Sequence, residues 1–252
     1  NLLKKGNMKK NRILLFAPNM IGVKGGVHRV QPGHGIGSIA GNLRDLGHEV
    51  IIRDSALEGY NNIEDTEFKD LVMIGESYAS IKNFIDDVKP DWILVSILFS
   101  NLVVHGKKIA EIVKSVDPKI KTILGGNHVN NTYTEVLNDR FVDYVVLGEC
   151  DFSVGELISS VLEGKDIGKI QGVAFKYDNK IISNGLSARI NDLNTLPREA
   201  RELMNMEGYF NVGLFHSAKS RTKRVGNIMA TRGCPEKCSF CTTPQMWGNI
   251  VR

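Results

Sequence analysis

The sequence contains no hydrophobic run long enough to cross a membrane. Its apolar stretches all fall short of the roughly 18–20 residues that a transmembrane helix needs. The first residues, Asn-Leu-Leu-Lys-Lys, hold too short an apolar part for a secretory signal peptide. Repeats and low-complexity tracts are also absent from the 252 residues. We therefore expect a cytoplasmic protein without a membrane partner.

The chain also lacks a strong excess of charge. Lys and Arg number 32 against 28 Asp and Glu, which leaves a net charge of +4. The basic residues are spread along the sequence, whereas nucleic-acid-binding domains gather them in a patch or stripe. No nucleic-acid partner is expected.

Apolar runs and amphipathic segments alternate over the first 165 residues. Strict alternation requires right-handed crossovers and a parallel sheet that is covered on both faces. The sequence therefore predicts an α/β domain over residues 8–165, with an open, doubly wound (flavodoxin/Rossmann-like), five-stranded parallel sheet. The expected strands are 12–17, 49–53, 92–98, 120–124 and 144–147, and the expected helices are 35–46, 77–88, 102–116, 132–138 and 152–162.

The pattern changes after residue 165. Two short apolar runs, 172–176 and 180–183, flank Tyr177-Asp178-Asn179, which is typical of a β-hairpin. Residues 191–224 show no sustained period and read as a connector, so we assign residues 166–224 to a connector that contains the hairpin. A new strand is predicted at 225–231.

Cysteine is scarce, and three of the four copies lie close together. Cys234, Cys238 and Cys241 have the spacing C-x3-C-x2-C, with no fourth Cys or His nearby. Structural zinc sites and electron-transfer clusters usually take four protein ligands. Three thiolates on one loop can hold three corners of a four-iron cluster and leave the fourth iron open to a cofactor or substrate. A zinc site completed by a remote residue, His216 or Cys150, is the alternative.

The cysteine segment resembles the signature of the radical S-adenosylmethionine enzymes, in which Arg232-Gly233 leads into Cys234-x3-Cys238-x-Phe240-Cys241. The resemblance implies a [4Fe–4S] cluster on the three cysteines, with S-adenosylmethionine on the open iron and Phe240 against its adenine. It also implies an electron donor of the flavodoxin or ferredoxin type. Residues 225–252 would then be the first strand and the cluster loop of a truncated (β/α) barrel, so we expect a fragment that is inactive by itself.

Residues 32–50 are similar to the pattern Pro-x-x-Gly…Leu-Arg-x-x-Gly-His-Glu-Val of cobalamin-binding domains that precede radical S-adenosylmethionine barrels. Segments at the ends of the third, fourth and fifth strands agree with the same family. Glycines there would let a bulky corrin approach the backbone, although turn geometry alone also explains such glycines. The expected cobalamin contacts are Gly35, Ser96, Leu98, Gly125, Gly126, His128, Gly148 and Glu149.

Neither His28 nor His34 lies in the complete Asp-x-His-x-x-Gly motif that supplies a histidine to cobalt in better-known cobalamin domains. A ligating histidine normally has its second ring nitrogen fixed by a hydrogen-bond partner. The sequence shows no such partner for either residue. We expect both to be loop residues and cobalt to receive no histidine from this chain.

The resemblance implies a cobalamin-dependent radical S-adenosylmethionine enzyme, most often a methyltransferase that uses a 5′-deoxyadenosyl radical to methylate an unactivated carbon of a small molecule. Three alternatives stay open. One is a cyclisation or rearrangement enzyme in which cobalamin is not the methyl carrier, and another is a non-catalytic cobalamin-binding module. In the third, the α/β domain has lost cobalamin altogether, which the incomplete histidine motif permits. Methylthio transfer to tRNA is disfavoured because the N-terminal domain carries only Cys150 rather than a second cysteine set.

Overall fold

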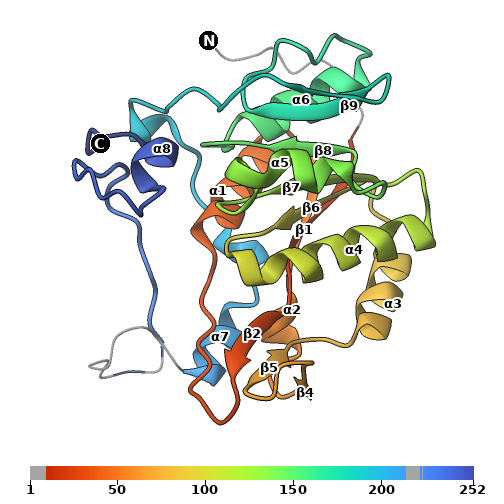
Figure 1. Ribbon diagram of the computed structural model, residues 1–252, viewed down its shortest axis with the longest axis vertical. Helices are drawn as coiled ribbons and strands as arrows, with labels where there is room; N and C mark the ends of the chain where they lie inside the picture. The colour runs from red at the N-terminus through yellow and green to blue at the C-terminus, as the bar shows by residue number, and fades with distance from the viewer. Residues whose placement is uncertain (1–9, 214–221, 223) are drawn as a thin grey trace.

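Five parallel strands form the centre of the structure, a computed structural model that describes residues 10–213, 222 and 224–252. They stand in the order β3-β1-β6-β7-β8, and β9 and β10 extend the sheet antiparallel beyond β8 (Figure 1). Numbered along the chain, the parallel strands follow the order 2-1-3-4-5 of flavodoxin-like sheets. The strands are β1 (Arg12–Ala17), β3 (Glu49–Asp54), β6 (Trp92–Ser96), β7 (Lys121–Gly125), β8 (Tyr144–Val146), β9 (Val173–Tyr177) and β10 (Lys180–Ser183).

Helices cover both faces of this sheet. One face packs against α1 and α6, and the other packs against α3, α4 and α5. The doubly wound parallel sheet predicted from the sequence is confirmed, with element ends that differ by up to three residues. These helices are α1 (His34–Asp45), α3 (Tyr78–Val88), α4 (Val103–Val116), α5 (Val129–Asn138) and α6 (Ser153–Leu162).

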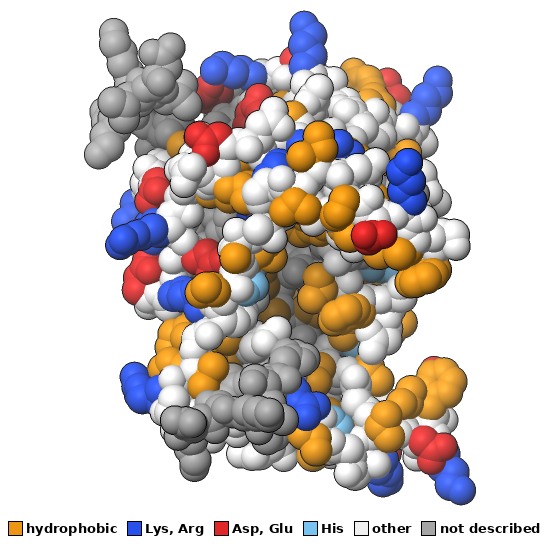
Figure 2. Space-filling view, turned by 90° about the vertical axis from the view of Figure 1, so that its left-hand side faces the viewer, with side chains coloured by type: hydrophobic (Ala, Val, Ile, Leu, Met, Phe, Trp, Pro, Cys, Tyr) orange, Lys and Arg blue, Asp and Glu red, His pale blue; other side chains and the backbone are white. Residues whose placement is uncertain are grey.

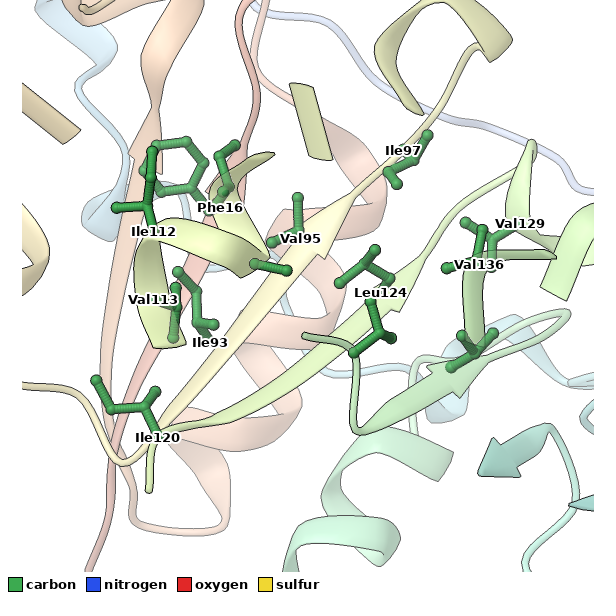
Figure 3. Packing of buried hydrophobic residues seen from close by; sticks show 14 of the residues in the cluster. Phe16, Ile93, Val95, Ile97, Ile112, Val113, Ile120, Leu124, Val129 and Val136 are labelled. Carbon is green, nitrogen blue, oxygen red and sulfur yellow. The ribbon is translucent and has the colours of Figure 1, made fainter. Parts of the chain in front are cut away.

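Alternate residues of β1 enter two separate hydrophobic cores. Leu14 and Phe16 belong to the core under α3, α4 and α5, whereas Ile13 and Leu15 belong to the core under α1 and α6. Figure 3 shows the first of these cores, with Phe16 on the side of α4 that carries Ile112. Truncating one fully buried side chain of this kind to Ala costs about 2–5 kcal/mol. The strand is therefore held from both faces, as a central parallel strand must be.

The hairpin of β9 and β10 is part of the main sheet rather than of a separate connector, which corrects the prediction. Tyr144 of β8 pairs with Phe175 of β9, and Val146 pairs with Val173. Without this pairing, the outer edge of β8 would leave its backbone N–H and C=O groups unpaired. The hairpin therefore covers the edge of β8, and β10 becomes the edge strand of the sheet.

The predicted strand at 225–231 is wrong. These residues form no strand, and their side chains are largely exposed, with Ile228 84% exposed. A strand needs a hydrogen-bonded neighbour, and the described residues offer none here. The segment contains apolar residues, as the prediction assumed, but no neighbouring strand forms backbone hydrogen bonds with it among the described residues.

Several short elements carry no clear sequence signal and were not predicted. They include a small antiparallel sheet in the order β2-β5-β4. The short elements are β2 (Met20–Val23), β4 (Ile63–Asp65), β5 (Leu71–Ile74), α2 (Ser55–Glu58), α7 (Met206–Val212), α8 (Thr243–Trp247) and three single 3-10 turns, η1 (Ser100–Leu102), η2 (Leu193–Thr195) and η3 (Arg201–Leu203).

Some predictions concern residues that the structure does not describe. Residues 8 and 9, His216 and the part of the connector at 214–221 fall in this group. In the portion that is described, no helix combines the length and apolar character needed to cross a membrane.

Candidate functional site

The carboxyl ends of β6 and β7 bring five of the predicted cobalamin contacts close together. Ser96 stands in register with Gly125, and the N–H of Ile97 donates to the carbonyl of Gly125 at 2.7 Å. The N–H of His128 donates back to the carbonyl of Ile97 at 3.3 Å. Leu98 and Gly126 lie in the same two loops, beside Ser96 and His128. The structure therefore brings these segments, separate in sequence, to one edge of the sheet.

This edge includes the point where the order of the parallel strands reverses, between β1 and β6. Open α/β sheets bind their ligands at this switch point, outside the carboxyl ends of the strands. The loop after β6 presents Leu98 and Phe99, which are 46% and 61% exposed. Figure 2 looks onto the side of the molecule where the strands end and shows a hollow flanked by hydrophobic side chains. The edge is thus an open apolar surface.

Close contacts within the chain account for three of the predicted glycines. Gly126 and Gly148 have φ values of +109° and +82°, a region that L side chains rarely adopt. A Cβ at Gly126 would lie 2.5 Å from the carbonyl oxygen of Ile97, and one at Gly125 would lie 2.6 Å from Val146 Cγ2. Gly35, in contrast, has open space around it. Turn and packing geometry therefore explains Gly125, Gly126 and Gly148 without a ligand, and their contact with cobalamin stays a prediction.

A polar residue that the sequence did not single out, Asn130, orders the same edge. Its Oδ1 accepts a hydrogen bond from the N–H of Gly148 at 2.8 Å. Asn130 also lines a cavity of about 220 Å³ together with Leu147 and Met246. Next to it, His128 Nδ1 lies 3.0 Å from Ser100 Oγ. An Asn shortly after a Gly-Gly turn is the one local signal that could have indicated this role.

His34 does have a carboxylate partner, which corrects the sequence analysis. Its Nδ1 lies 2.8 Å from Oε1 of Glu199, and Arg201 pairs with the same carboxylate. His34 is also the first residue of α1 rather than a loop residue, whereas His28 does lie in a loop. The partner comes from the connector, 165 positions away, so no local motif could reveal it.

Glu149, at the end of β8, faces the cysteine segment. Its carboxylate is 1% exposed and pairs with Arg232 at 3.2 Å and with Arg252 at 2.5 Å. Arg232 also binds both oxygens of Asp151, at 2.8 and 2.9 Å. Burial alone would lower the pKa of Arg232, but the hydrogen bonds and charges of Asp151 and Glu149 raise it above the ordinary value. This network attaches the cysteine segment to the carboxyl edge of the sheet.

The cysteine loop itself is held by backbone contacts. Gly233 has a φ of +102°, and a Cβ there would overlap the carbonyl oxygen of Ile250. The N–H of Cys234 donates to the carbonyl of Gly248 at 3.0 Å, and the N–H of Cys241 donates to the carbonyl of Cys238 at 3.1 Å. Gly233 is therefore required where the loop crosses the residues near the end of the chain.

All three cysteines of the loop carry free thiols that are at least partly exposed. Hydrogen bonds from Thr243, through its hydroxyl and its N–H, lower the pKa of the Cys241 thiol. Three such thiols suit iron by the chemistry of their donors. In the described part of the chain, however, no three Cys, His, Asp or Glu side chains converge in a group that could hold a metal ion.

Cys150 is a different kind of residue. It is buried, and burial together with the charge of Asp151 raises the pKa of its thiol to about 12. Its Sγ–H donates to the carbonyl of Gly148 at 3.2 Å. A thiol that stays protonated is a poor metal ligand, because thiolates bind metals. In the described residues, Cys150 belongs to no group of three or more Cys, His, Asp or Glu side chains that could hold a metal ion. His216, the other residue considered for a zinc site, lies outside the described residues.

Residues 23–157 match the profile of the B12 binding domain. This match covers more than half of the chain. The chain belongs to the B12-binding domain family. The resemblance inferred from residues 32–50 and from the strand ends is confirmed.

Curated relatives match most of this B12-binding chain. Cytidylyl-2-hydroxyethylphosphonate methyltransferase of Streptomyces wedmorensis is 26% identical over 96% of the chain and 49% of its own length. The anaerobic magnesium-protoporphyrin IX monomethyl ester cyclase of Rubrivivax gelatinosus is 27% identical over 73% of the chain and 32% of its own length. The chain thus spans about half or less of the length of these curated relatives.

A solved structure shows the same fold. The radical S-adenosylmethionine methyltransferase TsrM of Kitasatospora setae superposes with a TM-score of 0.65 at 17% identity, over 96% of this chain and 42% of TsrM. TsrM has been solved with cobalamin and a [4Fe-4S] cluster bound, and with tryptophan substrate and an S-adenosylmethionine analog. At this identity the likeness supports the fold of the B12-binding chain.

Proposed function

We propose that this B12-binding chain is part of a cobalamin-dependent radical S-adenosylmethionine enzyme that transfers a methyl group to a small-molecule substrate. One observation carries the proposal. The C-x3-C-x2-C loop is attached through Arg232 to Glu149 and Asp151, at the carboxyl edge of the B12-binding sheet. A cluster loop and a cobalamin edge are therefore held next to each other by one chain.

Each group of residues has a distinct role in this proposal. Cobalamin supplies a methyl carrier, and the cluster with S-adenosylmethionine supplies a radical that removes hydrogen from the substrate. Cys234, Cys238 and Cys241 hold the cluster, and Phe240, which is 89% exposed, is free to pack against adenine. The exposed apolar loop after β6 covers one side of the cobalamin and excludes water from it.

Methyl transfer is favoured because the similar Streptomyces protein is named a methyltransferase, as is TsrM. Ring formation is the second candidate, because three further relatives are named magnesium-protoporphyrin IX monomethyl ester cyclases. The remaining parts of the proposal are a flavodoxin- or ferredoxin-type electron donor, a cytoplasmic location and a longer protein that supplies the substrate pocket.

The first test measures both cofactors in the chain. Anaerobic purification with hydroxocobalamin, followed by reconstitution with iron and sulfide, should give about one cobalt and four irons per chain if one cobalamin and one [4Fe–4S] cluster bind. The variant Cys234→Ala/Cys238→Ala/Cys241→Ala should lose the iron and keep the cobalt. Tight zinc in place of iron would contradict the cluster, and absence of cobalt would contradict the cobalamin site.

The second test asks whether the protein is an enzyme. In the full-length protein, Cys238→Ala should abolish formation of 5′-deoxyadenosine from S-adenosylmethionine, because the cluster loses a ligand. A non-catalytic cobalamin-binding module would keep its function in this variant. The 252-residue chain alone should form no 5′-deoxyadenosine, and robust formation would contradict the proposal that it is only part of the enzyme.

A further inference from the structure

Arg232 lies two residues before the first cysteine of the loop, yet its side chain is directed into the B12-binding domain. Only 8% of the side chain is exposed. The guanidinium donates to both oxygens of Asp151, at 2.8 and 2.9 Å, and to Glu149 at 3.2 Å. Such a two-pronged contact fixes the orientation of both partners as well as their distance.

Both acids are themselves held in place from the domain side. Asp151 accepts a hydrogen bond from Ser38 Oγ of α1 at 2.5 Å, and both acids lie in the turn between β8 and α6. Glu149 receives a second arginine, Arg252, at 2.5 Å. Two buried carboxylates thus meet two arginines, and the charges balance. Buried charges persist in proteins when they are paired in this way.

The two arginines also close the cysteine segment into a ring. The N–H and carbonyl of Arg232 pair with the carbonyl and N–H of Arg252, at 3.1 and 2.8 Å. The guanidinium of Arg232 lies 5.0 Å from the ring centroid of Trp247. The three cysteines lie in the stretch of chain between Arg232 and Arg252. The position of these two arginines therefore determines the position of the cysteine loop.

We propose that Arg232, with Asp151 and Glu149, forms a clasp that fixes the cysteine loop at a set distance from the carboxyl edge of the B12-binding sheet. Arg232 is then a positioning residue, since it acts through the placement of the cysteine loop. The inference rests on the proposed function, in which both cofactors must reach one substrate. Opening the clasp leaves all cluster ligands and the whole sheet in place, and changes their relative position alone.

The test uses the chain reconstituted with cobalamin and iron–sulfur cluster. The main variant is Arg232→Met/Asp151→Asn, which removes one positive and one negative charge together and so leaves no unpaired buried ion. Arg224→Met is the matched control, because Arg224 forms an ion pair with Glu207 on the surface. Arg232→Lys keeps the charge but not the forked geometry and should fall in between.

Hydrogen exchange and cob(II)alamin spin relaxation measure whether the clasp holds the cysteine loop. Hydrogen exchange at the amides of Cys234 and Arg252 should become about tenfold faster or more in the double variant, while amides of β1 and β6 keep their protection. Cobalt and iron per chain should stay at the values of the unmodified chain. The enhancement of cob(II)alamin spin relaxation by the reduced cluster, which depends on their distance, should disappear. The Arg224→Met control should behave as the unmodified chain does in both measurements.

Unchanged exchange or unchanged relaxation in the double variant would overturn the clasp. If the unmodified chain binds no cobalt or no iron, the proposed function fails, and hydrogen exchange alone still decides whether Arg232 holds the loop. If the double variant loses its circular dichroism spectrum, Arg232→Lys gives the answer through the same exchange measurement. An exchange rate in Arg232→Lys equal to that of the unmodified chain would then count against the proposal.

Discussion

Burial separates Cys150 from the three loop cysteines. In the metal-free chain at pH 8, iodoacetamide should label Cys234, Cys238 and Cys241 and leave Cys150 intact, because only thiolates react readily. The pKa of Cys150 is raised to about 12, so its protection should persist as the pH rises past the ordinary thiol range of about 8.5. Mass spectrometry of tryptic peptides gives the labelling at each site.

The denatured chain provides the control for this experiment. In urea, Cys150 loses its buried environment, and all four thiols should react at similar rates. Rapid labelling of Cys150 in the folded chain would show that the end of β8 opens easily, contrary to the ion-pair network around Glu149 and Asp151.

His34 allows a test of the cobalt environment. We expect His34→Ala to leave the absorption spectrum of bound cobalamin unchanged, because the resemblance to radical-enzyme domains implies cobalt without a histidine ligand. Its stability should fall by about 1 kcal/mol in urea unfolding, since the contact with Glu199 joins α1 to the connector. His28→Ala is the matched control. A spectral shift in His34→Ala alone would instead identify His34 as a cobalt ligand that Glu199 orients.

Single residues also show where sequence reasoning stops. The three cysteines were found from their spacing, and the strand-end glycines from a resemblance to a family motif, and both are local properties of the sequence. The partners Glu199 of His34 and Asp151 of Arg232 are 165 and 81 positions away, respectively. Such pairs depend on the tertiary fold, which brings distant segments of the chain together. A single sequence carries no local signal of these contacts.

At the scale of elements, substituting Gly126 and Gly35 by alanine tests the turn geometry at the sheet edge. Gly126→Ala should destabilise the chain by about 2 kcal/mol or more, because the residue has a positive φ and its Cβ would press on the carbonyl of Ile97. Gly35→Ala, which places a methyl group in open space within α1, should be neutral or stabilise by up to about 1 kcal/mol. Urea unfolding without cobalamin measures both.

Equal effects of the two substitutions would show that the close contact at Gly126 is not maintained. The cobalamin affinity of the Gly35→Ala variant separately tests whether Gly35 contacts the cofactor. A loss of affinity without loss of stability would support the predicted contact of Gly35 with the cofactor, and an unchanged affinity would contradict it.

Elements with a clear hydrophobic pattern were predicted well, and those without one were not. The strands β1, β6 and β7 are continuous apolar runs because they are buried on both faces, and the amphipathic helices α3 and α4 have a helical period. In β4, by contrast, all three residues are exposed, so no apolar pattern marks it. The segment at 225–231 failed for the opposite reason, because an apolar run predicts burial but cannot supply a neighbouring strand.

At the scale of the whole molecule, the chain combines a densely packed sheet with a C-terminal segment that is held mainly by polar contacts and is drawn in blue in Figure 1. Residues 10–213 contain three hydrophobic clusters, whereas residues 224–252 bury few apolar side chains, and Ile228, Phe240 and Ile250 are all exposed. They are attached by the ion pairs of Arg232 and Arg252 and by the hydrogen bonds of Asn227 with Arg201 and Pro32. Regions with few buried contacts open at low free energy, before the core unfolds.

Cobalamin should therefore stabilise the sheet domain as a whole and act independently of the cysteine segment. A ligand that binds only the folded state adds RT ln(1 + [L]/Kd), or about 2.7 kcal/mol at a hundred times Kd. The family match ends at residue 157, far before Cys234, so the Cys234→Ala/Cys238→Ala/Cys241→Ala variant should gain the same stability from cobalamin as the unmodified chain. Urea unfolding with and without hydroxocobalamin measures this gain. A gain that vanishes in the variant would mean that the cysteine loop itself contacts cobalamin, and that the sheet edge alone does not form the binding site.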